Sequence, residues 1–366
     1  MKKIAKYSPE LVELARVYQV APDLPNPLLL DLANELQRLD DVEYCDLLSQ
    51  AGDSPLDWSA SWETTEPPLP ANTPTPSFLP FQGYIEAGAG MNVRGAWNRA
   101  VNGQNIHVLI RDTGVFPNHE DLAQIRQVSS GTGPDHGTAS AGVIMARNNG
   151  FGMLGIAFNV NASAYNNTEA GMNEVIRDAR PGDIVTMSLG SASGNVSLPM
   201  IHDRLRWDQL GRLSASGVVV VIGAGNGGVN LRNPPFQDFG DNGVLLAGAC
   251  VPATGRRVWF SNYNLRNFVN SWGLDVASCG YGDLFNAGAN RSYTAEYRGT
   301  SAATPLVAGV LALIQSYARN TYRTVFFNWQ MLHIINQTGA REGVPDMIGS
   351  RPNAEAALRF VDSLFL

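Results

Sequence analysis

Residues 217–222 read GVVVVI, a run with no polar side chain. Similar short runs lie on either side of it, IHVLI at 106–110 and IVTMS at 184–188 before it, and a fourth at 244–249 after it. Strands that are apolar along their whole length are typical of parallel sheets, because helices bury both faces of such a sheet. These four runs therefore predict the central strands of a parallel sheet.

Two further apolar segments have the length and composition of buried helices. One covers 138–146, and the other, at 302–314, is almost entirely apolar and is expected to cross the core. Strands that alternate with helices form βαβ units. The fold class that we predict is therefore α/β, with a mostly parallel central sheet and helices on both faces.

The first 80 residues have a different composition. Within residues 1–50, short strand-like runs flank a helix-like run at 28–39, which predicts a small N-terminal α/β segment. Residues 51–80 contain seven prolines, a composition typical of an extended, exposed linker. Residues 81–366 then form the main domain.

Composition and charge exclude several classes of protein. Of the 366 residues, 44% are hydrophobic and 16% charged, which excludes a disordered chain. The 26 Lys and Arg residues against 33 Asp and Glu residues give a net charge of −7, which argues against a nucleic-acid binder. No apolar run approaches the roughly 18 residues of a membrane span, and no apolar run of a signal peptide follows the basic start. Three cysteines are too few for a disulfide framework, although Cys250 and Cys279 could pair.

Four residues with useful chemistry lie at predicted ends of strands or helices. Asp112 follows the first strand in RDTG, and His136 opens a helix in DHGT. Asn226 follows the most apolar strand in GNGG, and Ser301 opens the last buried helix in GTSAATP. Each of these residues taken singly more commonly has a structural role. These roles are, in the same order, a loop carboxylate, a helix cap, a turn residue and an N-cap. Together they supply an acid, a base, an amide donor and a nucleophile at the edge where parallel sheets place active sites.

Five segments in the same order resemble the signature segments of the subtilisin-like serine peptidases, also called subtilases or the peptidase S8 family. They are IRDTGV at 110–115, DHGTASAGV at 135–143, VTMSLG at 185–190, GAGNGG at 223–228 and RGTSAATPLVAG at 298–309. The resemblance covers residues 81–366 and implies the subtilisin-like fold and polypeptide substrates.

The resemblance also assigns roles to individual residues. It implies that Asp112 orients the imidazole of His136, which acts first as general base and then as general acid. Ser301 would be the nucleophile. Asn226 would donate its side-chain amide to the developing oxyanion, together with the backbone N–H of Ser301.

Two stretches resemble the walls of the substrate cleft in this family. Ser188, Leu189 and Gly190 lie where subtilases pair an extended peptide. Ala224 and Gly225 would form the opposite wall. An open strand edge binds peptide backbone with little demand on side chains.

A calcium site is implied by the same resemblance. The polar loop at 147–153 resembles the calcium loop of many subtilases, and an ordinary Asn-Gly turn is the alternative. The implied ligand residues are Gln82, Asp121, Arg147, Asn149, Phe151 and Met153. Oxygen ligands from amides, a carboxylate and backbone carbonyls suit Ca²⁺.

Residues 1–50 resemble the second half of a subtilase prodomain, which would make the chain a zymogen whose own N-terminal segment inhibits it. This segment is short for a whole prodomain, so an N-terminal cap without inhibitory role is the alternative. Three departures from the family pattern stand out: Arg111 replaces an apolar residue before Asp112, Arg298 replaces a smaller polar residue, and the stretch between Tyr165 and Ser188 is short. That stretch normally supplies a second substrate-pairing edge.

Two other motifs in the sequence are incomplete. The GxGxxG match at 223–228 lacks the following helix of a dinucleotide-binding fingerprint, and Asp112-Thr113-Gly114 has no second DTG to complete an aspartic-protease dyad. A subtilase-fold peptide ligase or macrocyclase, or an inactive binding protein of this fold, stays open, because ligation and hydrolysis differ mainly in the access of water. The family resemblance slightly favours an extracellular protein, and the sequence leaves the compartment open.

Overall fold

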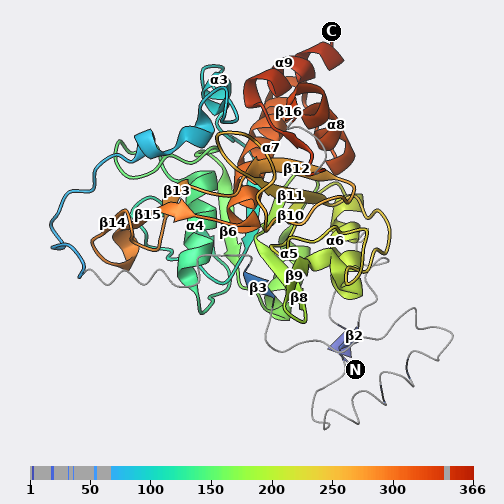
Figure 1. Cartoon of the computed structure of the whole chain (residues 1–366). Helices are drawn as coiled ribbons and strands as arrows, with labels where there is room; N and C mark the ends of the chain where they lie inside the picture. The colour runs from blue at the N-terminus through green and yellow to red at the C-terminus, as the bar shows by residue number, and fades with distance from the viewer. Residues whose placement is uncertain are drawn as a thin grey trace.

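The computed structural model describes residues 2–3, 18–19, 32, 36, 53–55, 67–341 and 347–366. Its largest element is a nine-stranded sheet with the strand order β16-β17-β12-β11-β10-β7-β4-β6-β5 (Figure 1). Neighbouring strands run parallel except at the edge pair β16–β17, which is antiparallel. The strands are β4 His107–Arg111, β5 Arg126–Gln127, β6 Asn161–Tyr165, β7 Ile184–Met187, β10 Val219–Gly223, β11 Leu245–Cys250, β12 Phe268–Trp272, β16 Ala340–Arg341 and β17 Ser350–Arg351.

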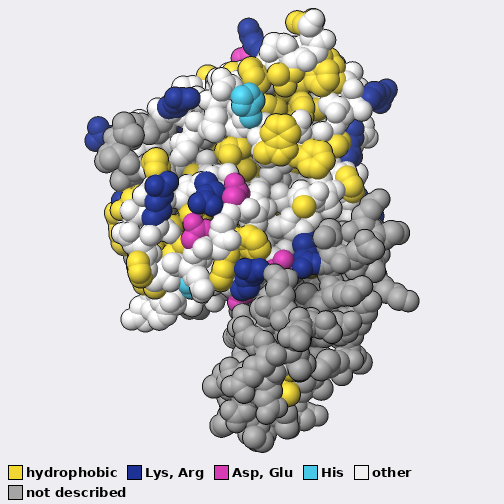
Figure 2. Space-filling view, turned by 90° about the vertical axis from the view of Figure 1, so that its right-hand side faces the viewer, with side chains coloured by type: hydrophobic (Ala, Val, Ile, Leu, Met, Phe, Trp, Pro, Cys, Tyr) yellow, Lys and Arg dark blue, Asp and Glu magenta, His cyan; other side chains and the backbone are white. Residues whose placement is uncertain are grey.

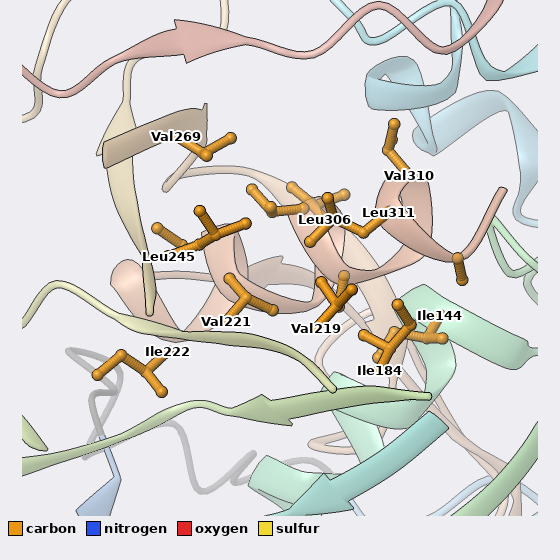
Figure 3. Close-up of a cluster of buried hydrophobic side chains, with 14 of the residues drawn as sticks. Ile144, Ile184, Val219, Val221, Ile222, Leu245, Val269, Leu306, Val310 and Leu311 are labelled. Atoms are coloured by element: carbon orange, nitrogen blue, oxygen red, sulfur yellow. The ribbon is translucent and has the colours of Figure 1, made fainter. Parts of the chain in front are cut away.

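All four apolar runs form central strands, displaced by one or two residues from the predicted bounds. The run GVVVVI becomes β10, in the middle of the sheet and completely buried. Figure 3 shows Val219 and Val221 of β10 beneath Leu306 and Leu311, whereas Ile222 points to the other face. Both faces of β10 are thus buried, and the predicted α/β class with a mostly parallel sheet is confirmed.

Helices cover both faces of the sheet. Helix α4 lies in the connection from β5 to β6, and α5 and α6 lie in the connections from β6 to β7 and from β7 to β10. Helix α5 packs against β4 and β6, and α6 packs against β10. Helix α7 packs against α4 and against β7, β10, β11 and β12. The helices are α3 Val93–Trp97, α4 Pro134–Met145, α5 Glu169–Asp178, α6 Arg204–Ala215, α7 Thr300–Tyr322, α8 Asn328–Thr338 and α9 Ala354–Leu364.

Helix α7 is the core helix that the sequence predicts at 302–314, and it is longer at both ends. It is long and apolar enough to cross a membrane, but 94% of its most apolar window is buried inside the protein. Pro305 lies within the helix, where it has no N–H to donate to the carbonyl of Ser301. That carbonyl instead accepts hydrogen bonds from the Ser188 Oγ at 3.0 Å and the Tyr297 hydroxyl at 3.1 Å.

Smaller elements surround the main sheet. A three-stranded sheet has the order β13-β15-β14, and a second has the order β3-β8-β9, seen at the lower edge in Figure 1. A short antiparallel pair joins β1 to β2. The bounds are β1 Lys2–Lys3, β2 Tyr18–Gln19, β3 Ser54–Pro55, β8 Leu189–Ser193, β9 Val196–Pro199, β13 Val276–Cys279, β14 Phe285–Asn286 and β15 Ser292–Tyr297, with 3-10 turns at Leu79–Phe81, Gly83–Ile85, Met200–His202 and Ala289–Arg291.

The N-terminal part of the chain lies largely outside the described residues. Of the helix predicted at 28–39, only Leu32 and Leu36 are described, and both are helical. Within the predicted linker at 51–80, residues 67–70 are exposed, whereas Phe78 is buried against Tyr293, with 4.8 Å between the ring centroids.

The described surface carries mixed charge. Figure 2 shows hydrophobic side chains gathered in the upper part of one face, and arginine and acidic side chains lying next to each other lower down. Positive charge on this face therefore forms no continuous stripe of the kind that binds nucleic acid.

Candidate active site

The candidate site lies at the carboxyl ends of the central strands. Asp112 follows β4 directly, Ser188 follows β7 directly, and Asn226 comes three residues after β10. Along the chain, β4 is the first strand of the sheet, and the sheet extends from it in both directions, to β6 and to β7. Ligands of parallel sheets bind at such a point, where the order of the strands reverses.

The acid, the base and the nucleophile predicted from the sequence lie in a hydrogen-bonded line. His136 Nδ1 is 2.5 Å from Asp112 Oδ1, and His136 Nε2 is 2.9 Å from Ser301 Oγ. His136 is the third residue of α4, and Ser301 is the second residue of α7. All three residues are buried, with exposed fractions of 1% for Asp112, 5% for His136 and 0% for Ser301. The geometry can pass a proton from the hydroxyl to the imidazole while the carboxylate holds the ring.

The carboxylate of Asp112 is fixed by donors that the sequence analysis did not identify. The backbone N–H of Thr113 donates to Oδ1 at 2.7 Å, and the Ser140 hydroxyl donates to Oδ2 at 2.9 Å. Tyr297 extends this network through its hydroxyl, 2.8 Å from Ser140 Oγ. Ser140 is four residues after His136 on the same helix face, a spacing that could have marked it. Tyr297 carries no such signal in the sequence.

A glycine allows the acid and the base to approach. A Cβ on Gly137 would lie 1.9 Å from the carbonyl oxygen of Gly114 and 3.0 Å from the Cβ of Asp112. Any side chain at this position would push α4 away from the loop that carries Asp112. The glycine after His136 therefore sets the distance between α4 and the loop that carries Asp112.

The side chain of Asn226 is anchored at the start of α7. Its Oδ1 accepts hydrogen bonds from the backbone N–H and from the hydroxyl of Thr300, both at 3.0 Å. Because the oxygen end of the amide is held by Thr300, the nitrogen end points away from Thr300 with the orientation of a donor. The N-terminus of α7 adds a favourable field for a negative charge close to Ser301. Thr300 is a further functional residue that the sequence analysis did not identify.

The opposite wall of the predicted cleft is also tied to α7. The N–H of Gly225 donates to the hydroxyl of Thr300 at 3.2 Å. Gly225 has a φ of +90°, and a Cβ there would lie 2.5 Å from the Asn262 side-chain nitrogen. Ala224 is buried, and its carbonyl accepts from the same Asn262 nitrogen at 2.8 Å. Both residues are therefore part of the frame around Asn226.

The edge predicted to bind substrate carries a segment of the chain's own N-terminal part. In β8, Leu189 pairs with Pro55 and Gly190 pairs with Ser54, in antiparallel register. The other edge of β8 pairs with β9. Ser188 is linked to the nucleophile, because its carbonyl oxygen lies 3.3 Å from Ser301 Oγ.

Asn167 provides the second edge in the short stretch between Tyr165 and Ser188. The N–H of Asp53 donates to the carbonyl of Asn167 at 3.0 Å, and the Asn167 side-chain amide donates to the carbonyl of Asp53 at 2.8 Å. The chain's own segment at this position is therefore held from two sides despite the short stretch.

The six predicted calcium ligand residues gather around one carboxylate and one amide. Asp121 accepts from the Asn149 side chain at 2.7 Å and from the N–H of Met153 at 2.8 Å, and its own carbonyl accepts from the N–H of Arg147 at 3.1 Å. The N–H of Phe151 donates to Asn149 Oδ1 at 3.3 Å.

Gln82 completes the group through the residue after the loop, because its Oε1 accepts from the N–H of Leu154 at 2.9 Å. Burial raises the pKa of Asp121 to about 6. Among the described residues, none pairs this carboxylate with a positive charge, and no three or more His, Cys, Asp and Glu side chains are grouped so that they alone could hold a metal ion. A buried carboxylate without a counter-charge can accept a divalent cation, which would replace the N–H donors of Asn149 and Met153 as its partners.

Cys250 and Cys279 are buried thiols and form no disulfide with each other. Arg298 forms an ion pair with Glu296, with 3.1 Å between Nη2 and Oε2.

Comparison with known proteins gives a consistent result. The family model described as "Subtilase family" matches residues 103–350. A thermostable alkaline protease from Halalkalibacterium halodurans is 29% identical over 276 residues, covering 71% of this chain and 69% of the relative. Alkaline elastase YaB from a Bacillus species is 32% identical over 284 residues, covering 72% and 67%. Subtilisin E from Bacillus subtilis is 30% identical over 239 residues, covering 60% and 58%.

Two solved structures share the fold. Proteases from Pseudoalteromonas arctica superpose with a TM-score of 0.60 at 23% identity, over 79% of this chain and 99% of the other. A cold-adapted subtilisin-like serine proteinase gives a TM-score of 0.52 at 22% identity, over 69% and 88%.

Proposed function

The chain belongs to the subtilase family of serine peptidases, and we propose that it is an endopeptidase that hydrolyses peptide bonds through Asp112, His136 and Ser301. The hydrogen-bonded line from the carboxylate through the imidazole to the hydroxyl carries this proposal. A fluorophosphonate that labels Ser301 in the wild-type protein, and no residue in a Ser301→Ala variant, is the direct test of the nucleophile.

Acylation follows from the positions of these three side chains. Ser301 Oγ attacks the carbonyl carbon of the scissile bond while its proton moves to His136 Nε2, 2.9 Å away. Asp112, 2.5 Å from Nδ1, keeps that nitrogen protonated and stabilises the imidazolium that forms. The imidazolium then gives its proton to the leaving amine as the C–N bond breaks, which leaves an ester on Ser301.

Deacylation repeats the same proton path with water. His136 removes a proton from a water molecule that attacks the ester, and it returns the proton to Ser301 Oγ as the acid product leaves. During both steps, the Asn226 side-chain amide and the Ser301 N–H donate to the oxyanion. The anchoring of Asn226 by Thr300 supports this role, because a donor that is already oriented needs no rearrangement in the transition state.

We further propose that the N-terminal segment inhibits the enzyme before it is removed. Two observations support this: residues 54–55 occupy the edge of β8 next to the nucleophile, and Ser301 has no exposed surface in the full chain. A substrate that pairs with β8 has to displace this segment.

Active enzyme is therefore expected to begin after Pro55 and before Gln82. Cleavage in this range removes the residues that pair with β8 and retains Gln82, the candidate calcium ligand. N-terminal sequencing of the purified active protein measures this start. The full-length Ser301→Ala protein, which cannot process itself, serves as the control. Active protein that still begins at Met1 would contradict removal of the segment.

We also propose that calcium binds at Asp121 with the oxygen donors of Gln82 and Asn149 and with backbone carbonyls of the loop at 147–153. Calcium there would supply the positive charge that the buried carboxylate lacks, and its role would be to stabilise the loop against unfolding. The triad and the oxyanion donors act without it.

Chelation is accordingly expected to lower the melting temperature. A ligand at 100 times its Kd stabilises the native state by about 2.7 kcal/mol, which corresponds to roughly 5 °C or more for a domain of this size. Thermal denaturation of the Ser301→Ala protein with calcium and with EGTA measures the shift without self-digestion. An Asp121→Asn variant should show a much smaller shift in melting temperature. Identical melting curves of the Ser301→Ala protein with calcium and with EGTA would contradict the site and indicate that residues 147–153 form an ordinary turn.

A further inference from the structure

Two arginines form a buried cluster beside the catalytic acid. Arg111 is the last residue of β4, directly before Asp112, and its side chain has no exposed surface. Arg206 lies on α6 with a side chain that is 8% exposed. Arg206 Nη1 pairs with Glu169 Oε2 at 2.5 Å and donates to Gln209 Oε1 at 2.8 Å. The cluster contains two positive charges and, from α5, one negative charge.

The second negative charge comes from Asp53, in the segment that lies on β8. Its Oδ2 is 2.5 Å from Arg111 Nη2 and 3.1 Å from Arg206 Nη2, and its Oδ1 accepts from Arg206 Nε at 3.3 Å. The Asp53 side chain is 12% exposed. With Asp53 in place the four charges balance, and without it one buried positive charge has no partner. An unpaired buried charge is strongly destabilising, so the cluster favours a carboxylate at this position.

The environment of Arg111 agrees with this charge balance. Burial lowers the pKa of Arg111, and the charge of Asp53 is the first influence that opposes this lowering. Arg111 Nη2 also donates to the carbonyls of Asn167 at 2.7 Å and Thr168 at 3.0 Å. Its Nε and Nη1 are buried without a hydrogen-bond partner among the described residues, so the guanidinium has donors left for a carboxylate.

The register on β8 relates this pocket to the scissile bond. Pro55 pairs with Leu189 and Ser54 pairs with Gly190, so the ladder runs toward Ser188 and the nucleophile. A substrate bound in the same register places its next residue opposite Ser188, whose carbonyl is 3.3 Å from Ser301 Oγ. The carbonyl of that next residue is the one attacked. The site of Asp53 then receives the fourth substrate residue on the amino side of the scissile bond.

We propose that Arg111 and Arg206 form a specificity pocket that selects substrates with an acidic side chain, aspartate above all, at the fourth position before the scissile bond. This inference rests on the proposed function, because it assigns the selectivity of the same cleft. Asn167 holds the backbone of that residue from the second side, so the side chain is directed into the pocket. Asp53 occupies the pocket in the chain's own N-terminal segment in the way that a substrate residue would.

The test compares quenched fluorogenic peptides that differ only at the fourth position, with Asp, Asn, Ala or Lys there. The full-length protein as expressed is suitable, because a competing segment lowers kcat/KM for every peptide by the same factor and leaves their ratios unchanged. The Asp peptide should be cleaved with a kcat/KM at least about tenfold above that of the isosteric Asn peptide, and the Lys peptide should be the poorest. Equal kcat/KM values for the Asp and Asn peptides would contradict the proposed pocket.

Variants then locate the effect. Arg206→Gln should reduce the Asp-to-Asn ratio to within about twofold, since the remaining arginine is balanced by Glu169. Arg212→Gln removes an arginine from the same helix, where it pairs with Asp208 at 2.8 Å, and should keep the wild-type ratio. A ratio that survives in Arg206→Gln would contradict the pocket. If Arg206→Gln does not fold, the wild-type peptide series decides alone.

Failure of the pocket and failure of the proposed function give different results. If the wild-type protein cleaves neither casein nor any peptide of the series, the proposed function fails. Binding of the same peptides to the Ser301→Ala protein, followed by fluorescence anisotropy, still tests the pocket in that case. Binding of the Asp peptide about tenfold tighter than the Asn peptide supports it, and equal binding overturns it.

Discussion

Replacing Ser301 with alanine is expected to lower kcat by about 10⁶-fold, with little change in KM. This magnitude is the one known for removal of the subtilisin nucleophile and is carried over from that relative. The physical reason is that the Ser301 Oγ is the hydroxyl that lies 2.9 Å from the base, His136 Nε2. Without it no acyl-enzyme forms, and the remaining rate comes from the oxyanion donors and from binding.

Hydrolysis of casein and of a fluorogenic peptide measures the loss, and circular dichroism verifies the fold. Ser316→Ala is a matched control, because Ser316 is a buried serine on the same helix whose hydroxyl bonds to the carbonyl of Gln104 at 2.7 Å. Unchanged hydrolysis in Ser301→Ala would remove the proposed mechanism. Mass spectrometry of the products from a peptide library separates cleaved peptides from joined ones, and joined products would indicate a ligase.

Replacing Asn226 with alanine is expected to lower kcat by about 10²- to 10³-fold, with KM nearly unchanged. The side-chain amide is held by Thr300 so that its nitrogen can meet the oxyanion, a charge that exists only after the attack. An interaction that forms only in the transition state affects kcat and leaves ground-state binding alone.

Asn226→Asp separates this donor role from the anchoring role. Aspartate keeps an oxygen for the N–H and hydroxyl of Thr300, so the start of α7 stays in place, but it has no N–H to give to the oxyanion. The aspartate variant should therefore match the wild type in melting temperature and lose at least as much kcat as the alanine variant. A wild-type kcat in Asn226→Asp, or an effect limited to KM in Asn226→Ala, would show that the amide does not act on the oxyanion.

The central strands and the hydrogen-bonded line of Asp112, His136 and Ser301 were accessible from the sequence because each has a local signal. GVVVVI has to be buried on both faces, and Asp112 follows a strand of the same type directly. His136 and Ser301 open apolar helices, which the chain must pack against the sheet. Since the carboxyl ends of parallel strands share one edge, these local positions converge without any knowledge of long-range contacts.

The contacts that the sequence did not reveal depend on tertiary pairing. Asp53 lies in a proline-rich stretch whose composition indicates only a linker, yet its neighbours pair with β8 more than 130 positions later. Tyr297 reaches the hydrogen-bond network of Asp112 from the end of β15, and nothing in its local sequence marks it. Arg111 stood out as a departure from the family pattern, but its partners, Asp53 and the carbonyl of Asn167, come from distant segments.

Pro305 affects how rigidly the start of α7 is connected to the proposed substrate-binding edge. Because the ring nitrogen carries no hydrogen, the Ser301 carbonyl accepts from Ser188 and Tyr297 instead. These contacts fasten the first turn of α7 to the residue directly before β8 and to the end of β15. The Ser301 hydroxyl and the β8 edge are therefore rigidly connected. We expect them to move together when the sheet flexes, so that the distance between Ser301 and a peptide on β8 is preserved.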